Sequence, residues 1–134
     1  MEPLRIELVD AYQMHLESPD TFNYPSTDEI NNIVIGDKVK VSNGKERFWN
    51  IIVEKYDNYL IGEINNHLID NQNYDCGNKI IIEPRHIYQI RTIKEAEDIE
   101  DDFNNFLANP RGHVPRFYET FVLIQMYLDN NKKN

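Results

Sequence analysis

The sequence contains two side chains with the chemistry of a thiol–imidazole pair, in which a histidine base activates a cysteine nucleophile. They are Cys76, which is the only cysteine, and His86. A fully extended strand between these positions would hold them about 30 Å apart. We therefore interpret Cys76 as an unreactive thiol near a turn, and a lone cysteine excludes a disulfide within the chain.

Histidine spacing gives no sign of a metal centre. The four histidines, none of which belongs to a His-x-His or His-x-x-x-His pair, are His15, His67, His86 and His113. Metal binding would therefore require the fold to gather distant side chains. The five glycines are scattered and form no phosphate-binding loop. We expect neither a metal nor a cofactor.

Carboxylates in and beside the polar segment 65–78 offer a different chemistry. Asp70 and Asp75 lie within this segment, and Glu83 follows it. Paired carboxylates perform acid–base catalysis or hold Mg²⁺. A small enzyme that uses this loop, with Asp70, Asp75 or His86 as the catalytic group, is one hypothesis. Because the spacing is not diagnostic, we favour a protein that is not an enzyme and has no catalytic residues.

Basic side chains gather on the first predicted hairpin, with two tyrosines nearby. Basic residues interleaved with aromatic rings bind a nucleic-acid strand or another partner. The alternative is an ordinary charged hairpin face, and the formal net charge of −9 opposes an extended nucleic-acid footprint. The candidate residues are Lys38, Lys40, Lys45, Arg47, Lys55, Tyr56 and Tyr59.

Trp49 and the acidic run 95–102 each have a structural and a binding interpretation. Trp49 alternates in phase with Ile51 and Val53, which favours a core anchor over a ligand platform. The acidic run is typical of a solvated helix face. It would also suit an acidic inhibitor or accessory protein of a virus or mobile element, which offers carboxylates to a basic surface. Asn and Ile are frequent, and their codons, like those of Lys and Tyr, are AT-rich, which indicates an AT-rich genome such as that of a giant virus, an amoeba or a low-GC bacterium.

The chain as a whole has the size of one ordinary domain, and we expect a single domain over residues 1–134. Hydrophobic residues make up 40% of it, which is enough for a packed core. No leader pattern is visible, and no apolar run approaches the ~20 residues that span a bilayer. We expect no membrane association and a cytoplasmic location, or the virion or host cytoplasm if the protein is viral.

Residues 1–33 are expected to form a helical N-terminal segment. A helical repeat that ends before Pro19 is carried by Leu4, Leu8, Tyr12 and Leu16. Ser26 and Glu29 have the spacing of a capping box, which predicts a short second helix.

Residues 34–93 are expected to form the β core. Asn43-Gly44 predicts a tight type I′ hairpin, and Gly62 indicates a bulge or the close approach of another backbone. Short strands joined by tight turns favour a small curled sheet or a partly open barrel. The five strands are predicted over residues 34–41, 47–56, 59–64, 79–83 and 87–93.

Residues 94–129 are expected to form two C-terminal helices. The last helix is apolar on more than one side, so we predict that the chain associates with itself through it. The residues expected to carry this contact are Phe117, Phe121, Met126 and Tyr127.

Several different short motifs are spread through residues 21–93. They are Phe22-x-x-Pro25-Ser26, Ile30, Gly36-Asp37-x-Val39-Lys40-Val41, Glu46-Arg47-Phe48-Trp49, Gly62-x-Ile64-x-Asn66 and His86-Ile87. In these motifs the chain resembles a family of small bacterial domains of unknown function. The chain departs from the family at Phe48, where Met is usual, at Asn50, where Val is expected, and at Gly77-Asn78, where a second Gly-Asp occurs. The resemblance implies an SH3-like barrel and no activity, because fold does not fix function.

These observations predict an α+β protein in which a small five-stranded antiparallel SH3-like barrel or curled sheet is flanked by an N-terminal helix and two C-terminal helices. We expect a non-catalytic interaction module with a protein partner. Nucleic-acid binding through the basic hairpin and an acidic viral inhibitor are the alternatives.

Overall fold

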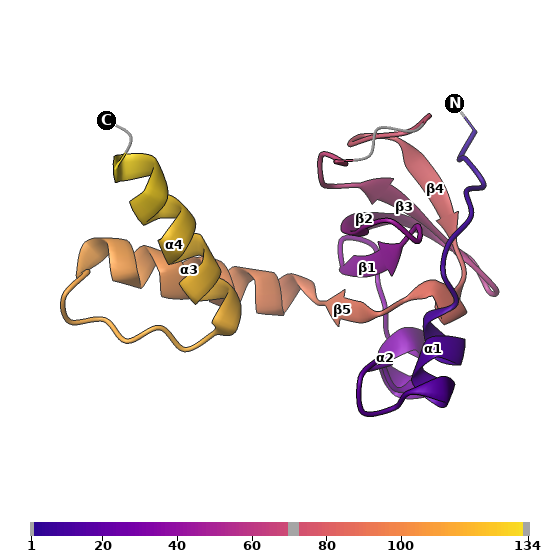
Figure 1. The fold of residues 1–134 in the computed structure, drawn as a ribbon, viewed down its shortest axis with the longest axis horizontal. Coiled ribbons are helices and arrows are strands. Elements are labelled where there is room, and N and C mark those ends of the chain that lie inside the picture. The colour runs from indigo at the N-terminus through magenta and orange to yellow at the C-terminus, as the bar shows by residue number, and fades with distance from the viewer. Residues whose placement is uncertain (1, 70–72, 133–134) are drawn as a thin grey trace. The chain divides into compact units, whose positions relative to one another are not determined.

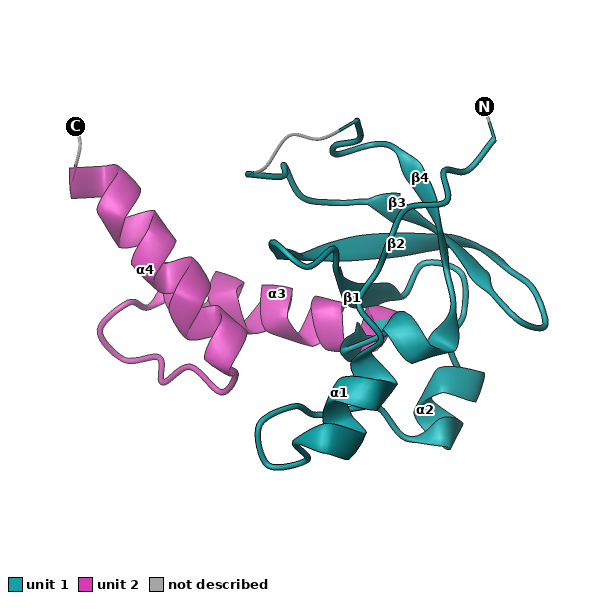
Figure 2. Ribbon diagram, turned by 45° about the vertical axis from the view of Figure 1, so that its right-hand side comes forward, with its two compact units in different colours: residues 1–92 teal, residues 93–134 magenta. Residues whose placement is uncertain are grey.

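The structure is a computed structural model that describes residues 2–69 and 73–132, so Asp70 lies outside the described residues. The fold is α+β, as predicted, and its described part contains a five-stranded antiparallel sheet and four α-helices. The chain forms two compact units, Met1–Thr92 and Ile93–Asn134 (Figure 2). The sheet and two short helices belong to the first unit, and the two long helices form the second.

The sheet has the strand order β4-β3-β2-β1-β5, and all neighbouring strands are antiparallel (Figure 1). The first four strands follow each other as a meander, and the last strand returns to pair with the first. Because β4 and β5 are the two edges, strand pairing does not close the sheet into a barrel. The strands are β1 Lys38–Ser42, β2 Arg47–Lys55, β3 Leu60–Ile64, β4 Lys79–Ile82 and β5 Gln89–Arg91.

The turn between β1 and β2 forms a hairpin, as predicted, but not a type I′ turn. The N–H of Asn43 donates to the carbonyl of Glu46, so Gly44 and Lys45 are the central residues. A positive φ occurs at Gly44 (91°) and at no described non-glycine residue. A type II′ turn needs a positive φ only at its first central residue, which is where Gly44 stands.

Alternation along the strands determines the core. In β2, Phe48, Asn50 and Ile52 are buried, whereas Trp49 and the residues in phase with it are half-buried on the opposite face. The prediction that Trp49 anchors the core is therefore wrong, although its alternation with Ile51 is real. The core cluster consists of Ile33, Val39, Val41, Phe48, Ile52, Leu60, Ile64, Leu68, Ile80, Ile82 and Ile87.

Gly62 marks a close approach, as its position inside a strand predicted. A Cβ atom at Gly62 would lie 2.7 Å from Cδ1 of Ile82 and 2.9 Å from Cβ of Asn50. The fully buried Asn50 donates from Nδ2 to the carbonyls of Val39 (3.3 Å) and Phe48 (3.4 Å). Its Oδ1 accepts no hydrogen bond from the described residues, so a polar atom without a partner lies in the apolar core.

The N-terminal segment is mostly extended, which corrects the predicted helix over Leu4 to Leu16. Leu4 forms a bridge to β4, where its N–H donates to the carbonyl of Lys79 and its carbonyl accepts from Ile81. These bonds satisfy backbone groups of an edge strand, which outweighs the helical repeat of the side chains. Helix α1, Ala11–Glu17, begins only after Asp10, whose carboxylate caps it through the N–H of Gln13.

The predicted capping box is confirmed at helix α2, Thr27–Asn31. Ser26 Oγ accepts from the N–H of Glu29, and the Glu29 carboxylate accepts from the N–H of Ser26. A 3-10 helix, η1, covers Pro84–His86 between β4 and β5.

The second unit consists of helices α3, Ile93–Ala108, and α4, Tyr118–Lys132. The carboxylate of Asp102 on α3 is fully buried and accepts from the N–H groups of Arg116 (2.9 Å) and Phe117 (3.4 Å), just before α4. Nε2 of His113 lies 2.7 Å from the same carboxylate. Asp102 therefore supplies a negative charge to the start of α4, where helix N–H groups lack partners.

Candidate binding site

The predicted basic patch divides into separate groups along β2. Lys38 and Lys40 alternate with the buried Val39 and Val41, so they lie on the outer face of the sheet. Arg47 is exposed at the start of β2, and Lys55 is exposed at its end. At about 3.3 Å per residue, these two positions are about 26 Å apart. The structure therefore does not bring all the predicted residues into one site.

A cluster of cations surrounds Trp49 on the outer face of β1, β2 and β5. Nζ of Lys40 and Cζ of Arg91 each lie 5.0 Å from the centre of the Trp49 ring. Both distances fit cation–π contacts. Sequence reasoning missed Arg91 because only the pairing of β5 with β1 places it beside Lys38.

The other end of β2 carries Lys55 and two predicted tyrosines. Nζ of Lys55 donates to the carbonyls of Asn31 (2.9 Å) and Ile33 (2.7 Å), so it serves the end of α2. The rings of Tyr56 and Tyr59 stack with their centres 4.8 Å apart, and both side chains are exposed. A hydrogen bond to Glu54 raises the pKa of Tyr56. Lys55 is thus a structural cation, and the tyrosines are open to a partner.

A groove adjoins these tyrosines. A hollow of about 500 Å³ lies between α1, α2 and η1, and its lining includes Tyr12, Tyr24 and Ile30. A second hollow of about 80 Å³ shares Ile30, Asn31 and Pro84 with the first, and its lining includes Tyr56 and Tyr59. We call the two adjoining hollows the tyrosine groove.

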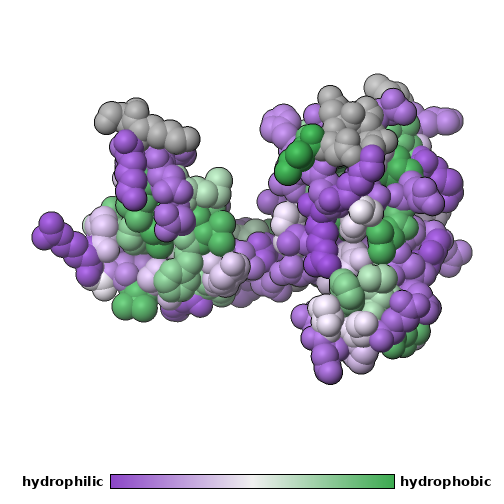
Figure 3. All heavy atoms as spheres, viewed as in Figure 1, coloured by the Kyte–Doolittle hydropathy of each residue, from purple (hydrophilic) through white to green (hydrophobic). Residues whose placement is uncertain are grey.

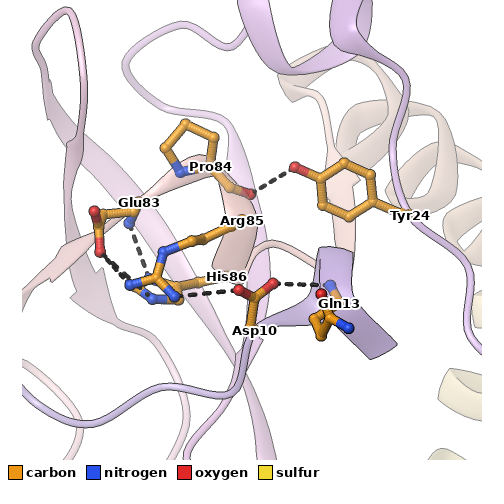
Figure 4. A network of polar contacts seen from close by, with 7 residues as sticks. All are labelled: Asp10, Gln13, Tyr24, Glu83, Pro84, Arg85 and His86. Carbon is orange, nitrogen blue, oxygen red and sulfur yellow. Dashed lines mark hydrogen bonds and ion pairs between the residues drawn. The ribbon is translucent and has the colours of Figure 1, made fainter. Parts of the chain in front are cut away.

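The rings of the groove are held in place. Tyr12 and Tyr24 meet edge to face with centres 5.1 Å apart, and the hydroxyl of Tyr24 donates to the carbonyl of Pro84 at 3.1 Å (Figure 4). Burial raises the pKa of Tyr24, which keeps this hydroxyl protonated. Tyr12 remains 46% exposed, so a large ring is presented to solvent in a fixed orientation.

An ionic network supports one wall of the groove. Arg85 lies between Asp10 (3.2 Å) and Glu83 (2.9 Å), as Figure 4 shows. The carboxylate of Asp10 also caps α1, and the N–H of Gln13 is the main cause of its lowered pKa. The network therefore ties α1 to η1. Because these ion pairs are partly exposed to solvent, they orient α1 and η1 more than they stabilise the fold.

His86 in this network is a structural histidine. Its Nδ1 accepts from the N–H of Glu83 at 3.0 Å, which requires the neutral ring. Burial lowers the pKa of His86, and the charge of Arg85 lowers it further. His86 thus closes the 3-10 turn, and the distance from its Nε2 to the Glu83 carboxylate is 3.7 Å.

The residues of the enzyme hypothesis have structural contacts of their own. The carboxylate of Asp75 accepts from the N–H groups of Leu68 and Cys76, so it organises its loop and has a lowered pKa. Cys76 is exposed, and His86 follows the far end of β4. Across the described ranges 2–69 and 73–132, no three His, Cys, Asp or Glu side chains are placed to hold a metal ion.

The four residues predicted for self-association differ in exposure. Phe121 and Met126 on α4 are 53% and 57% exposed, and Figure 3 shows apolar residues, in green, over α4. Tyr127 is 40% exposed, and its ring also meets Phe103 edge-on, with centres 6.3 Å apart. Phe117 is half-buried. Self-association through these residues stays a prediction.

The acidic run on α3 is also only partly exposed to solvent. Glu95, Glu97, Glu100 and Asp101 are exposed, as expected of a solvated face. Asp102 is the exception, since it is fully buried. No sequence signal separates Asp102 from its acidic neighbours, because its partners lie in the loop before α4.

No protein-family model, curated protein or solved structure matches the chain. The resemblance to the bacterial family therefore stays a prediction. In the part of the chain that the structure describes, no helix has the length and apolar character needed to cross a membrane.

Proposed function

We propose that the protein is a non-catalytic interaction module whose tyrosine groove binds an extended segment of a protein partner. The observation that carries this proposal is the set of exposed, ordered rings, Tyr12, Tyr56 and Tyr59, around adjoining hollows. Tyrosine is enriched in protein interfaces because it brings a large apolar area and a hydroxyl at a small entropic cost.

The shape and chemistry of the groove suit an extended chain. The adjoining hollows run from Tyr12 on α1 to Tyr59 before β3, so successive side chains of a peptide would meet successive rings. Aromatic grooves of this kind bind extended and proline-rich segments, whose own ordering cost is low. The carbonyl of Pro84 accepts from Tyr24 and the carboxylate of Glu83 pairs with Arg85, and each oxygen keeps a further lone pair for a peptide N–H at the wall.

We further propose that the first unit is an SH3-like barrel, as the resemblance implied. Two observations support this. The last strand returns to the first strand of a meander, and the segment from Leu4 to Val9 bonds to β4 at one end and to Ser42 of β1 at the other. The segment thus connects β4 to the end of β1, two strands that do not pair with each other in the sheet.

The test is a capture experiment in which the full chain is the bait in native cell lysate, with and without nuclease. We expect a protein that survives nuclease, is lost with the Tyr12→Ala/Tyr59→Ala variant, and is retained by Tyr118→Ala, whose ring is 78% exposed on α4. Retention by the groove variant would contradict the proposal. Recovery of the bait alone would favour self-assembly or a small-molecule ligand.

Nucleic-acid binding is the second candidate, and the cation cluster around Trp49 favours it. Lys38, Lys40 and Arg91 share the outer face of the sheet, with Arg47 at the start of β2. Binding to phosphates predicts an affinity that falls steeply with salt. Reversal of Lys38, Lys40 and Arg47 to Glu should abolish it, while Lys79→Glu, at the exposed first position of β4, should not. Unchanged binding by the triple variant would exclude this face.

Self-association through α4 also remains a proposal, supported by the exposure of Phe121 and Met126. Light scattering over a range of concentrations should show a mass that rises for the natural chain and stays monomeric for Phe121→Asp/Met126→Asp. A monomer at all concentrations for the natural chain would contradict self-association.

The acidic-inhibitor hypothesis has its own test. The Glu95→Lys/Glu97→Lys/Glu100→Lys variant should no longer form a complex with a basic protein.

A further inference from the structure

A polar hollow of about 320 Å³ lies apart from the tyrosine groove's lining, where residues 21–23 approach β1 and β5. Its lining also includes Lys40, Arg47, Tyr88 and Gln89. Two of these side chains are cationic, and none is acidic. This is unusual in a chain with 23 acidic and 14 basic residues.

Arg47 is held in this hollow by aromatic rings. Its guanidinium carbon lies 4.4 Å from the centre of the Tyr88 ring and 5.9 Å from that of Phe22. Stacking orients the plane of the guanidinium while its N–H groups remain at the edge. Among the described residues, the exposed side chain of Arg47 forms no hydrogen bond or ion pair.

Arg85 gives a comparison within the same unit. It is neutralised by Asp10 and Glu83, and both carboxylates lie within 3.2 Å of it. Arg47 has rings where Arg85 has carboxylates, so its charge and its donors stay available. An oriented guanidinium fork of this kind binds two oxygens of a phosphate or carboxylate at once.

We propose that this hollow is a binding site for a phosphate monoester. Arg47 would hold two phosphate oxygens, and the ammonium group of Lys40 would add a second positive charge. A monoester carries nearly two negative charges at neutral pH and so matches the pair better than a carboxylate or a phosphodiester does. The side chains of Asn23 and Gln89 bring neutral amide donors to the lining. The proposal does not depend on the tyrosine groove.

The test is NMR titration of the full chain with O-phospho-L-tyrosine, AMP and inorganic phosphate, and with tyrosine, adenosine and acetate as matched probes. We expect the three phosphate probes to shift the amides of residues 21–23, 40, 47 and 88–89, and the matched probes to leave them in place. Affinity should fall as the pH drops below about 6, where the monoester gains a proton. Preference for phosphotyrosine over AMP would point to a phosphorylated side chain, and the reverse order to a free nucleotide.

Variants make the assignment to Arg47 specific. Arg47→Gln should weaken phosphate binding about ten-fold or more, and Arg47→Lys should lie between, because it keeps the charge but loses the fork. Lys79→Gln, at an exposed position of β4 outside the lining of the hollow, should bind as the natural chain does, and a thermal melt checks that each variant folds. Equal binding by Arg47→Gln, equal weakening by Lys79→Gln, or no shift with any phosphate probe would overturn the proposal.

Discussion

The 1–92 unit and the 93–134 unit differ in how much apolar surface they bury beside their buried polar groups. The first buries a cluster of branched aliphatic residues around Phe48, with Asp37, Ser42, Asn50 and His86 as its buried polar residues. Among its described residues, the second buries only Ile99 and Phe106 of its apolar side chains, beside the polar Asp102 and Thr120. Its apolar side chains on α4 are instead largely exposed.

This difference separates two ways to stabilise a small structure. Apolar burial grows with the number of packed residues and depends little on any single one. A buried carboxylate with several donors concentrates the stability in one group, because its loss leaves those donors without partners. The second unit should therefore be more sensitive to a single polar substitution than the first.

The largest expected effect is that of Asp102→Ala. Removal of the carboxylate leaves the N–H groups of Arg116 and Phe117 and the ring of His113 without their acceptor. We expect a loss of about 3 kcal/mol, enough to unfold a two-helix unit. Loss of helical circular dichroism in a denaturant titration measures it. Asp101→Ala, at the exposed neighbouring position, should change little, and equal effects of the two would refute the role of Asp102.

Gly62→Ala should be the strongest single-atom change in the first unit. The added Cβ would lie 2.7 Å from Ile82 and 2.9 Å from Asn50, both fully buried. Overpacking of this kind costs about 2 kcal/mol. The fluorescence of Trp49, which reports the first unit alone, follows the unfolding. Glu63→Ala, one residue later and half-buried, is the control, and a neutral Gly62→Ala would show that the sheet yields there.

Asn50→Val should stabilise the first unit. The Oδ1 atom of Asn50 has no donor among the described residues, and the bonds from Nδ2 are long. An apolar side chain removes this cost, so we expect a gain of about 1 kcal/mol in the free energy of unfolding. Asn50→Asp, which places a carboxylate in the same site, should destabilise. A destabilising Asn50→Val would mean that the amide bonds matter more than their lengths indicate.

The pH dependence of the two units should differ. Burial lowers the pKa of His86 below 6.5, so the first unit is most stable above pH 6.5 and weakens as the pH falls below it. Burial acts to raise the pKa of Asp102, but its hydrogen bonds lower it from 3.8 to about 2. The second unit therefore keeps this contribution above pH 4 and loses it between pH 4 and 2.

Melts followed by Trp49 fluorescence and by helical dichroism between pH 7 and 2 separate the two transitions. His86→Gln should flatten the first, and Asp102→Asn the second. A single shared transition, or one unmoved by these variants, would contradict the assignment.

Local rules of the sequence predicted much of the fold. Alternation over Lys38 to Val41, the turn at Asn43-Gly44 and the capping box at Ser26 act within a few residues, so the structure shows a strand, a hairpin and a helix there. Gly62 could be predicted as a bulge or a close approach, because glycine inside a strand usually marks one of these two, and the structure shows the close approach. The repeat from Leu4 to Leu16 led to a wrong helix prediction, because a pattern of side chains cannot show that the backbone of an edge strand needs hydrogen-bond partners.

The candidate sites were only partly accessible from the sequence. Tyr56, Tyr59, Lys40 and Arg47 were found because aromatic and basic residues cluster locally. Tyr12, Tyr24 and Pro84 were not, because they meet only when α1, the following linker and η1 pack together.

The α+β class, the antiparallel hairpins and the residue types available for binding could be read from the sequence, since they depend on periodicity and on neighbours in the chain. Three features needed the folded structure: Trp49 faces outward among cations, Arg85 is neutralised while Arg47 is not, and Asp102 is buried. Burial and ion pairing join residues that lie far apart in the sequence, and their approach depends on packing and on the backbone hydrogen bonds that must be satisfied.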